Sequence, residues 1–247
     1  MPAPQPLIAG NWKMNGLAAS LAEAKAVAAG LGATPARVAI CPPSSLIDRM
    51  SQALVGTAVL TGAQDCHAEA SGAFTGDVAA EQLADAGARL VIVGHSERRA
   101  GHGETDTDVA AKARAALRAG LEPIVCVGET LDQRKAGGAL KVVTGQVRGS
   151  LPAELAGQAF SVAYEPVWAI GTGLTPTTPE IEEMHRAIRA VLVEMFGEAG
   201  RAVPILYGGS VKPGNAAEIL HADEVGGALV GGASLLAKDF LAIIHAV

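Results

Sequence analysis

Long apolar runs and clusters of basic residues are both absent from this sequence. None of its apolar stretches approaches the roughly 20 residues that a membrane-spanning helix requires. The net charge of −6, without any basic run, argues against a nucleic-acid or anionic-membrane partner. The N-terminal residues also lack the charged start and apolar core of a signal peptide. We therefore expect a soluble cytoplasmic protein with neither kind of partner.

Cysteine is scarce as well. The three cysteines, Cys41, Cys66 and Cys126, are far apart and have no metal-ligand spacing. This pattern indicates free thiols in a reducing compartment, with Cys41 and Cys126 as small buried side chains. No cluster of His, Cys or Asp residues predicts a metal site.

Short apolar runs of the β type do recur along the whole chain. Most of them are continuous rather than alternating, as expected for parallel strands that are covered on both faces. The predicted strands span residues 7–12, 38–41, 58–62, 90–93, 123–127, 160–164, 203–207 and 228–230.

Segments with helical spacing separate these strands. The clearest span residues 17–31, 107–119 and 179–196, the last with Thr177 or Thr178 as N-cap, and weaker ones span 78–86, 138–149, 215–220 and 235–244. Strand followed by helix, repeated without a linker, predicts one (βα)8 barrel domain over residues 1–247. A doubly wound dinucleotide fold would need a glycine fingerprint after an early strand, and residues 7–14 contain none.

Active sites of such barrels lie at the C-terminal ends of the strands. Glu165 follows the sixth predicted strand, and Pro166 then removes a backbone donor. An apolar tip, residues 167–170, comes next and is followed by Gly171 and Gly173. This arrangement predicts a general base beneath a closing lid, with a surface glutamate in an ordinary loop as the alternative.

Two more strand ends carry side chains with useful chemistry. Lys13 follows the first predicted strand, and His95 follows the fourth, just before Ser96, which we expect to cap a short helix. Backbone donors at that helix start would bind the imidazole and disfavour its protonated form. A neutral imidazole opposite a carboxylate and a lysine can polarise a carbonyl group. The alternatives are a solvated lysine and a histidine satisfied in the core.

The last two predicted strands each end in a pair of glycines. Gly208 and Gly209 precede Ser210 after the seventh strand, and Gly231 and Gly232 follow the eighth. Both turns open toward a helix, so their backbone N–H groups can approach an oxyanion closely. Barrels place their phosphate site at this position.

Five motifs in this order resemble the triosephosphate isomerase family over residues 7–240. They are Asn-Trp-Lys-Met-Asn at 11–15, Gly-His-Ser-Glu-Arg-Arg at 94–99, Tyr-Glu-Pro-Val-Trp-Ala-Ile-Gly-Thr-Gly at 164–173, Tyr-Gly-Gly-Ser-Val at 207–211 and Val-Gly-Gly-Ala-Ser at 230–234. The resemblance implies a (βα)8 barrel that interconverts dihydroxyacetone phosphate and glyceraldehyde 3-phosphate through an enediolate, with no cofactor and no metal.

Residue by residue, the resemblance makes Glu165 the general base and His95 the neutral electrophile. Lys13 would be the cation that faces the substrate, with Asn11 beside it. Glu97 matches a second carboxylate near Lys13, whose role stays open. The resemblance also assigns phosphate binding to backbone groups, those of Gly171, Ser210, Gly231 and Gly232.

The lid departs from the pattern of the family at one position. In the family, a tyrosine that matches Tyr207 bonds a backbone N–H in the hinge of the lid. Pro176 stands at the corresponding place and has no N–H. The resemblance therefore implies that this contact moves to a neighbouring residue or is lost.

Residues 64–78, from Gln64 to Val78, form a segment that is long for a strand-to-helix connection. The resemblance implies a homodimer in which this loop inserts into a second subunit, beside Asn11, Lys13 and Glu97. Phe74 at its tip favours burial by a partner. A mobile surface loop is the alternative.

Two other functions stay open at this point. A paralogue that isomerises a four-carbon sugar phosphate would share the same catalytic set. A non-catalytic barrel scaffold is a different class, and it would be expected to have lost Lys13, His95 or Glu165, all of which are present.

Overall fold

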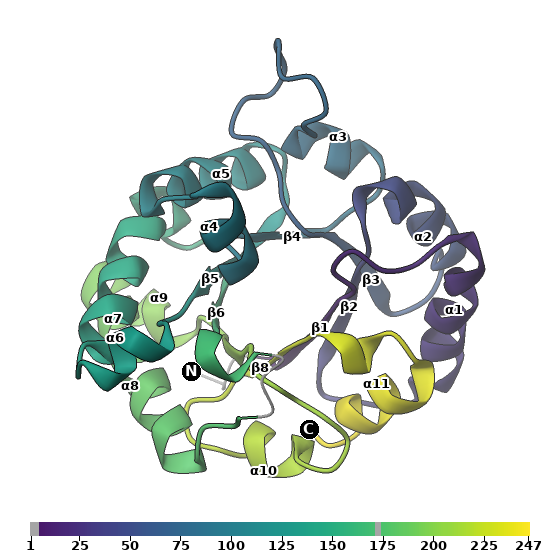
Figure 1. The fold of residues 1–247 in the computed structure, drawn as a ribbon. Coiled ribbons are helices and arrows are strands. Elements are labelled where there is room, and N and C mark those ends of the chain that lie inside the picture. The colour runs from purple at the N-terminus through teal and green to yellow at the C-terminus, as the bar shows by residue number, and fades with distance from the viewer. Residues whose placement is uncertain (1–4, 171–173) are drawn as a thin grey trace.

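The computed structural model describes residues 5–170 and 174–247. Within them the chain forms a closed barrel of parallel strands in the order β1 to β8, and the helices surround it as a ring (Figure 1). The strands are β1 (Leu7–Asn11), β2 (Arg37–Cys41), β3 (Val59–Ala63), β4 (Leu90–Val93), β5 (Glu122–Val127), β6 (Ser161–Tyr164), β7 (Ile205–Tyr207) and β8 (Gly227–Val230). The predicted (βα)8 fold is confirmed.

The helices follow the strands on the outside of the barrel. They are α1 (Leu21–Gly30), α2 (Ile47–Ala53), α3 (Ala80–Asp85), α4 (Ser96–His102), α5 (Asp106–Arg118), α6 (Leu131–Lys135), α7 (Ala139–Ser150), α8 (Thr178–Phe196), α9 (Glu198–Arg201), α10 (Ala216–Leu220) and α11 (Ala237–Ile244). Short 3-10 turns are η1 (Ala18–Ser20), η2 (Ser44–Leu46), η3 (Ala153–Leu155), η4 (Val167–Ala169) and η5 (Gly232–Ser234).

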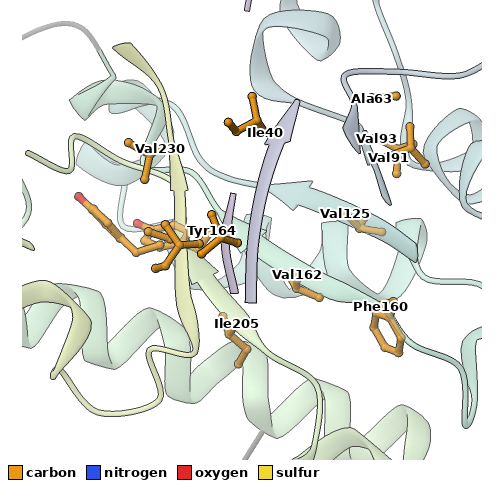
Figure 2. Packing of buried hydrophobic residues seen from close by; sticks show 14 of the residues in the cluster. Ile40, Ala63, Val91, Val93, Val125, Phe160, Val162, Tyr164, Ile205 and Val230 are labelled. Carbon is orange, nitrogen blue, oxygen red and sulfur yellow. The ribbon is translucent and has the colours of Figure 1, made fainter. Parts of the chain in front are cut away.

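The strands divide the core into two layers because successive side chains point to opposite faces. Leu7 and Ala9 of β1 lie in an inner cluster that fills the barrel, whereas Ile8 between them packs outward against the helices. Figure 2 shows part of this outer layer, including Val125 and Val162. Both layers are apolar, which explains why the strands read as continuous apolar runs.

Helix α8 shows how local sequence fixes an element. The backbone N–H and the hydroxyl of Thr177 both donate to the carboxylate of Glu180, at 2.8 and 2.9 Å, so Thr177 is the N-cap. The buried face of the helix repeats at intervals of three and four residues. Its members include Ile181, Met184, Ile188, Val191 and Leu192.

No helix in the described ranges has the length and apolarity needed to span a membrane. The three cysteines are all free and buried.

Candidate active site

The C-terminal strand ends surround a hollow of about 590 Å³. Its walls include most of the residues singled out from the sequence, namely Asn11, Lys13, His95, Glu165, Ser210, Gly231 and Gly232. Glu97 lines an adjacent hollow instead, together with Lys13. Gly171 lies outside the described residues, so its predicted part in phosphate binding stays a prediction.

Glu165 follows β6 directly and is only 1% exposed. One carboxylate oxygen accepts the Ser96 backbone N–H at 2.9 Å, and the other lies 3.1 Å from the Ser96 hydroxyl and 2.9 Å from Nε2 of His95. Gly208 makes room for this side chain, since a Cβ at Gly208 would stand 2.9 Å from Cγ of Glu165. The carboxylate is therefore fixed by three donors and by a neighbouring glycine.

His95 is the N-cap of α4, in place of the predicted Ser96, which is the first residue of the helix. Its Nδ1 accepts the backbone N–H of Glu97 at 3.2 Å. Nε2 of the same ring faces the Glu165 carboxylate. The backbone N–H that reaches Nδ1 is of the kind expected at this helix start, and the neutral state of His95 stays a prediction.

Opposing effects act on the pKa of the Glu165 carboxyl. Burial raises it, because the ion loses its hydration. The imidazole of His95 and both donors of Ser96 lower it, and together they keep the pKa of Glu165 below its ordinary value of 4.5. The carboxyl group is therefore ionised at neutral pH.

Lys13 follows β1 with a left-handed backbone conformation, φ +52°. Asn11 accepts its N–H at 3.0 Å, and the side-chain amide of Gln64 donates to its carbonyl at 2.9 Å. These bonds offset the strain of a positive φ in a residue with a side chain. The ammonium group reaches Glu97, with Nζ 2.5 Å from Oε1. Its stem passes Gly231, where an added Cβ would lie 3.6 Å from Cε of Lys13.

The opposite side of the hollow includes the glycine pairs that follow β7 and β8. Gly231 and Gly232 lead into the 3-10 turn η5, which is held by the Ser234 hydroxyl bonded to the Gly231 carbonyl at 2.7 Å. The indole of Trp12 donates to the Ser234 carbonyl at 3.1 Å. This bond ties the β8 loop to the residue that precedes Lys13.

A buried glutamate, Glu129, anchors the segment after Glu165. It is 0% exposed and accepts three bonds, from the Tyr164 hydroxyl at 3.1 Å, the Trp168 indole at 2.8 Å and Nε of Arg134 at 3.0 Å. The guanidinium of Arg134 also lies 5.0 Å from the centre of the Trp168 ring. The sequence analysis did not identify Glu129 and Arg134 as site residues, although Glu129 follows β5 at the strand end where barrel sites lie.

The Tyr207 hydroxyl is buried and has no hydrogen-bond partner in the part of the chain that the structure describes. Pro176 is also buried and cannot supply a backbone N–H.

Metal-ligating side chains do not cluster in groups of three or more anywhere in residues 5–170 and 174–247.

A closed parallel barrel with a carboxylate, an imidazole and a lysine at its C-terminal strand ends has the architecture of a (βα)8-barrel enzyme. Residues 6–247 match the family model described as triosephosphate isomerase. The triosephosphate isomerase of Caulobacter vibrioides is 68% identical over 246 residues, covering 99% of this chain and 97% of that protein. That of Afipia carboxidovorans is 60% identical, covering 98% and 97%.

The crystal structure of triosephosphate isomerase from Bartonella henselae superimposes with a TM-score of 0.93 at 46% sequence identity, covering 98% of both chains. The chain therefore belongs to the triosephosphate isomerase family, and it is an isomerase.

Proposed function

We propose that the protein interconverts dihydroxyacetone phosphate and D-glyceraldehyde 3-phosphate through an enediolate. The observation that carries the proposal is the contact of 2.9 Å between the Glu165 carboxylate and Nε2 of His95, in a hollow that Lys13 also lines. A base, a neutral donor and a cation are the groups that an aldose–ketose isomerisation requires.

The chemistry moves one proton between adjacent carbons. The Glu165 carboxylate takes the proton from one carbon and returns it to the other. The N–H of His95 and the charge of Lys13 stabilise the two oxygens of the enediolate in between. Glu165 is now bonded to Ser96, so it must exchange these donors for the substrate before it can act as a base. The role of Glu97 is to pair with Lys13 and fix the position of its ammonium group.

The phosphate group of the substrate binds to main-chain N–H groups of Ser210, Gly231 and Gly232, with Gly171 completing the set. Asn11 and Lys13 also contact the substrate. The apolar tip that contains Trp168 covers the site and excludes water, which protects the enediolate from losing its phosphate.

The active form is a homodimer. The segment from Gln64 to Val78 projects beyond the ring of helices (Figure 1), and Phe74 in it is 43% exposed. The adjacent hollow, about 900 Å³ in volume, is lined by Lys13, Glu97 and Arg98. We infer that the projecting loop of a second copy enters this hollow and supports Lys13 from across the interface. Buried free thiols are consistent with the reducing environment of the cytoplasm, where we place the protein.

A coupled assay with glyceraldehyde 3-phosphate tests the activity directly. We expect turnover of the three-carbon substrate and little with a four-carbon sugar phosphate. Preference for the four-carbon substrate would assign the chain to a paralogous activity. Full activity in Glu165→Gln would remove this glutamate from the role of base, and inactivity toward both substrates in the folded protein would favour a non-catalytic scaffold.

A further inference from the structure

Arg99 joins the two strands that lead to the catalytic groups. Its Nε donates to the Gly94 carbonyl at 2.9 Å, and one of its terminal nitrogens donates to the Cys126 carbonyl at 3.2 Å. Gly94 directly precedes His95 at the end of β4, and Cys126 lies on β5. The guanidinium therefore bonds main-chain atoms of both strands with a rigid, planar set of donors.

The Cys126 carbonyl has lost its partner in the sheet. The paired register of β4 and β5 ends at Val93 and Val125, because Gly94 has φ +68° and turns the chain away. The next carbonyl along β5, that of Val127, accepts the backbone N–H of Glu165 at 2.7 Å. Since successive carbonyls point to opposite sides of a strand, the Cys126 carbonyl faces β4. Arg99 supplies the donor that β4 no longer provides.

The other partners of Arg99 hold its guanidinium in place. Asp106 accepts from it at 2.7 Å, and the buried Ser150 hydroxyl accepts from it at 2.9 Å and donates to the same Asp106 oxygen at 3.0 Å. Gly94 fits closely against this group, as an added Cβ would lie 3.2 Å from an Arg99 terminal nitrogen. The partners of Arg99 therefore have separate roles. Asp106 balances the charge of the guanidinium, and the carbonyls of Gly94 and Cys126 accept its directed hydrogen bonds.

We propose that Arg99 is a positioning residue for the isomerisation. It continues the β4–β5 ladder past Val93 and so sets the spacing between His95, attached through Gly94, and Glu165, attached through Val127. This inference rests on the proposed roles of His95 and Glu165. Arg99 does not line the hollow described above, so it acts only through the atoms that it holds.

Arg99→Lys and Asp106→Asn form a matched pair that separates positioning from stability. Lysine keeps the ion pair with Asp106, but one ammonium group cannot bond both carbonyls in the same geometry. We expect kcat to fall roughly 10- to 100-fold, the range of a displacement of up to about 1 Å, with KM changed by less than about threefold. Asp106→Asn keeps the bonds to Gly94 and Cys126, so we expect a lower Tm with kcat close to that of the wild type.

The ¹⁵N NMR resonance of His95 Nε2 gives a readout that a merely structural role would not move. It should shift in Arg99→Lys and stay in place in Asp106→Asn. The double variant Arg99→Gln with Asp106→Asn leaves no unpaired charge, so it replaces Arg99→Lys if that variant does not fold. We expect the same loss of kcat and the same shift of the His95 resonance.

Wild-type kcat in either folded Arg99 variant, or loss of kcat in step with Tm across the whole set, would overturn the positioning role. The proposed function is tested separately in the same series of measurements: full activity in Glu165→Gln would overturn it. The His95 resonance still tests Arg99 in that case.

Discussion

The two sides of the site differ in the kind of group that borders the hollow. On the side of β4 to β6, the proposed reacting groups are side chains that are almost entirely buried, with His95 6% and Glu165 1% exposed, and they bond one another. On the side of β7 and β8, the hollow is bordered by glycine-rich turns that include Ser210, Gly231 and Gly232, and Gly232 is exposed.

This difference matches the role that we propose for each side. A proton transfer depends on the position of one atom, so the side chain that bears it needs fixed contacts on all sides. Holding an anion depends on several N–H dipoles, which the main chain supplies whatever side chain is attached. Substitutions should therefore be costly on the first side and mild on the second.

The largest expected effect tests the first side. Glu165→Asp keeps the charge but withdraws the carboxylate by about one methylene, and a misplacement of about 1 Å costs on the order of 100-fold in rate. We expect that loss in kcat, with a modest change in KM, in a steady-state assay. If the Asp variant kept near-wild-type kcat, the position of the carboxylate would not limit the rate, and the contrast between the two sides of the site would be wrong.

Replacing residues 72–77 with a short polar turn tests whether the first side depends on a second copy. The change removes Phe74 from the projecting loop and leaves the strands untouched. We expect a folded monomer whose kcat is lower by a factor of tens, on the order of what loss of a pre-positioned cation costs. Light scattering and a rate assay on one sample measure both properties. A monomer with normal kcat would separate Lys13 from the interface, and a variant that is still dimeric would place the interface elsewhere.

His185 sharpens the comparison because it is a second buried histidine with no reacting partner. Its Nδ1 lies 3.1 Å from the Glu224 carbonyl, while Nε2 is buried without a partner among the described residues. Desolvation lowers the pKa of His185 from 6.5 to about 4. Between these values the unfolded chain binds a proton that the native state does not, so stability is lost as the pH falls.

From about pH 7 to about pH 5 this linkage removes on the order of 2 kcal/mol from the free energy of unfolding. Urea unfolding at both pH values measures it. We expect His185→Gln to flatten this part of the pH dependence, and the exposed His221→Gln to leave it unchanged. An unchanged slope in the first variant would assign the acid sensitivity to another group.

The smallest expected effect belongs to the second side. Ser210→Ala leaves the backbone N–H in place, so we expect kcat/KM to fall by less than about fivefold, far below the roughly 100-fold cost of losing an oxyanion donor. A loss of that full size, in steady-state kinetics on the folded variant, would show that the hydroxyl holds the anion. The contrast between side-chain and main-chain sides would then disappear.

Strands were the part of the fold most open to prediction from the sequence, because two-sided burial leaves continuous apolar runs. The boundaries moved where backbone chemistry intervened. The run at 203–207 yields a strand only from Ile205, since Pro204 cannot donate to the ladder. The segment 17–31 divides into a 3-10 turn and α1, because the Ser20 hydroxyl accepts the Leu17 N–H at 3.1 Å. The helices α2 and α6 were not predicted, since they have too few residues for a periodic signal.

The candidate site was predictable to the extent that its residues stand at strand ends. Glu165, His95 and Lys13 were found in this way, and the structure brings them around one hollow. Arg99 and Arg134 were not assigned roles, because each contacts a residue distant in the sequence, Cys126 and Trp168 respectively, and these contacts exist only in the folded chain. Spacing along one sequence carries no trace of such contacts.

The two tryptophans of the chain occupy opposite kinds of environment, and this makes the protein its own optical probe. Trp12 is 1% exposed beside the barrel, with its indole bonded to Ser234. Trp168 lies between a carboxylate and a guanidinium, two charged groups that perturb indole emission. Because Trp12 also lines the hollow, a change in intrinsic fluorescence on adding a phosphate ligand reports on both ends of the site with no label attached, and Trp168→Phe separates the signal of the segment above Glu165 from that of Trp12.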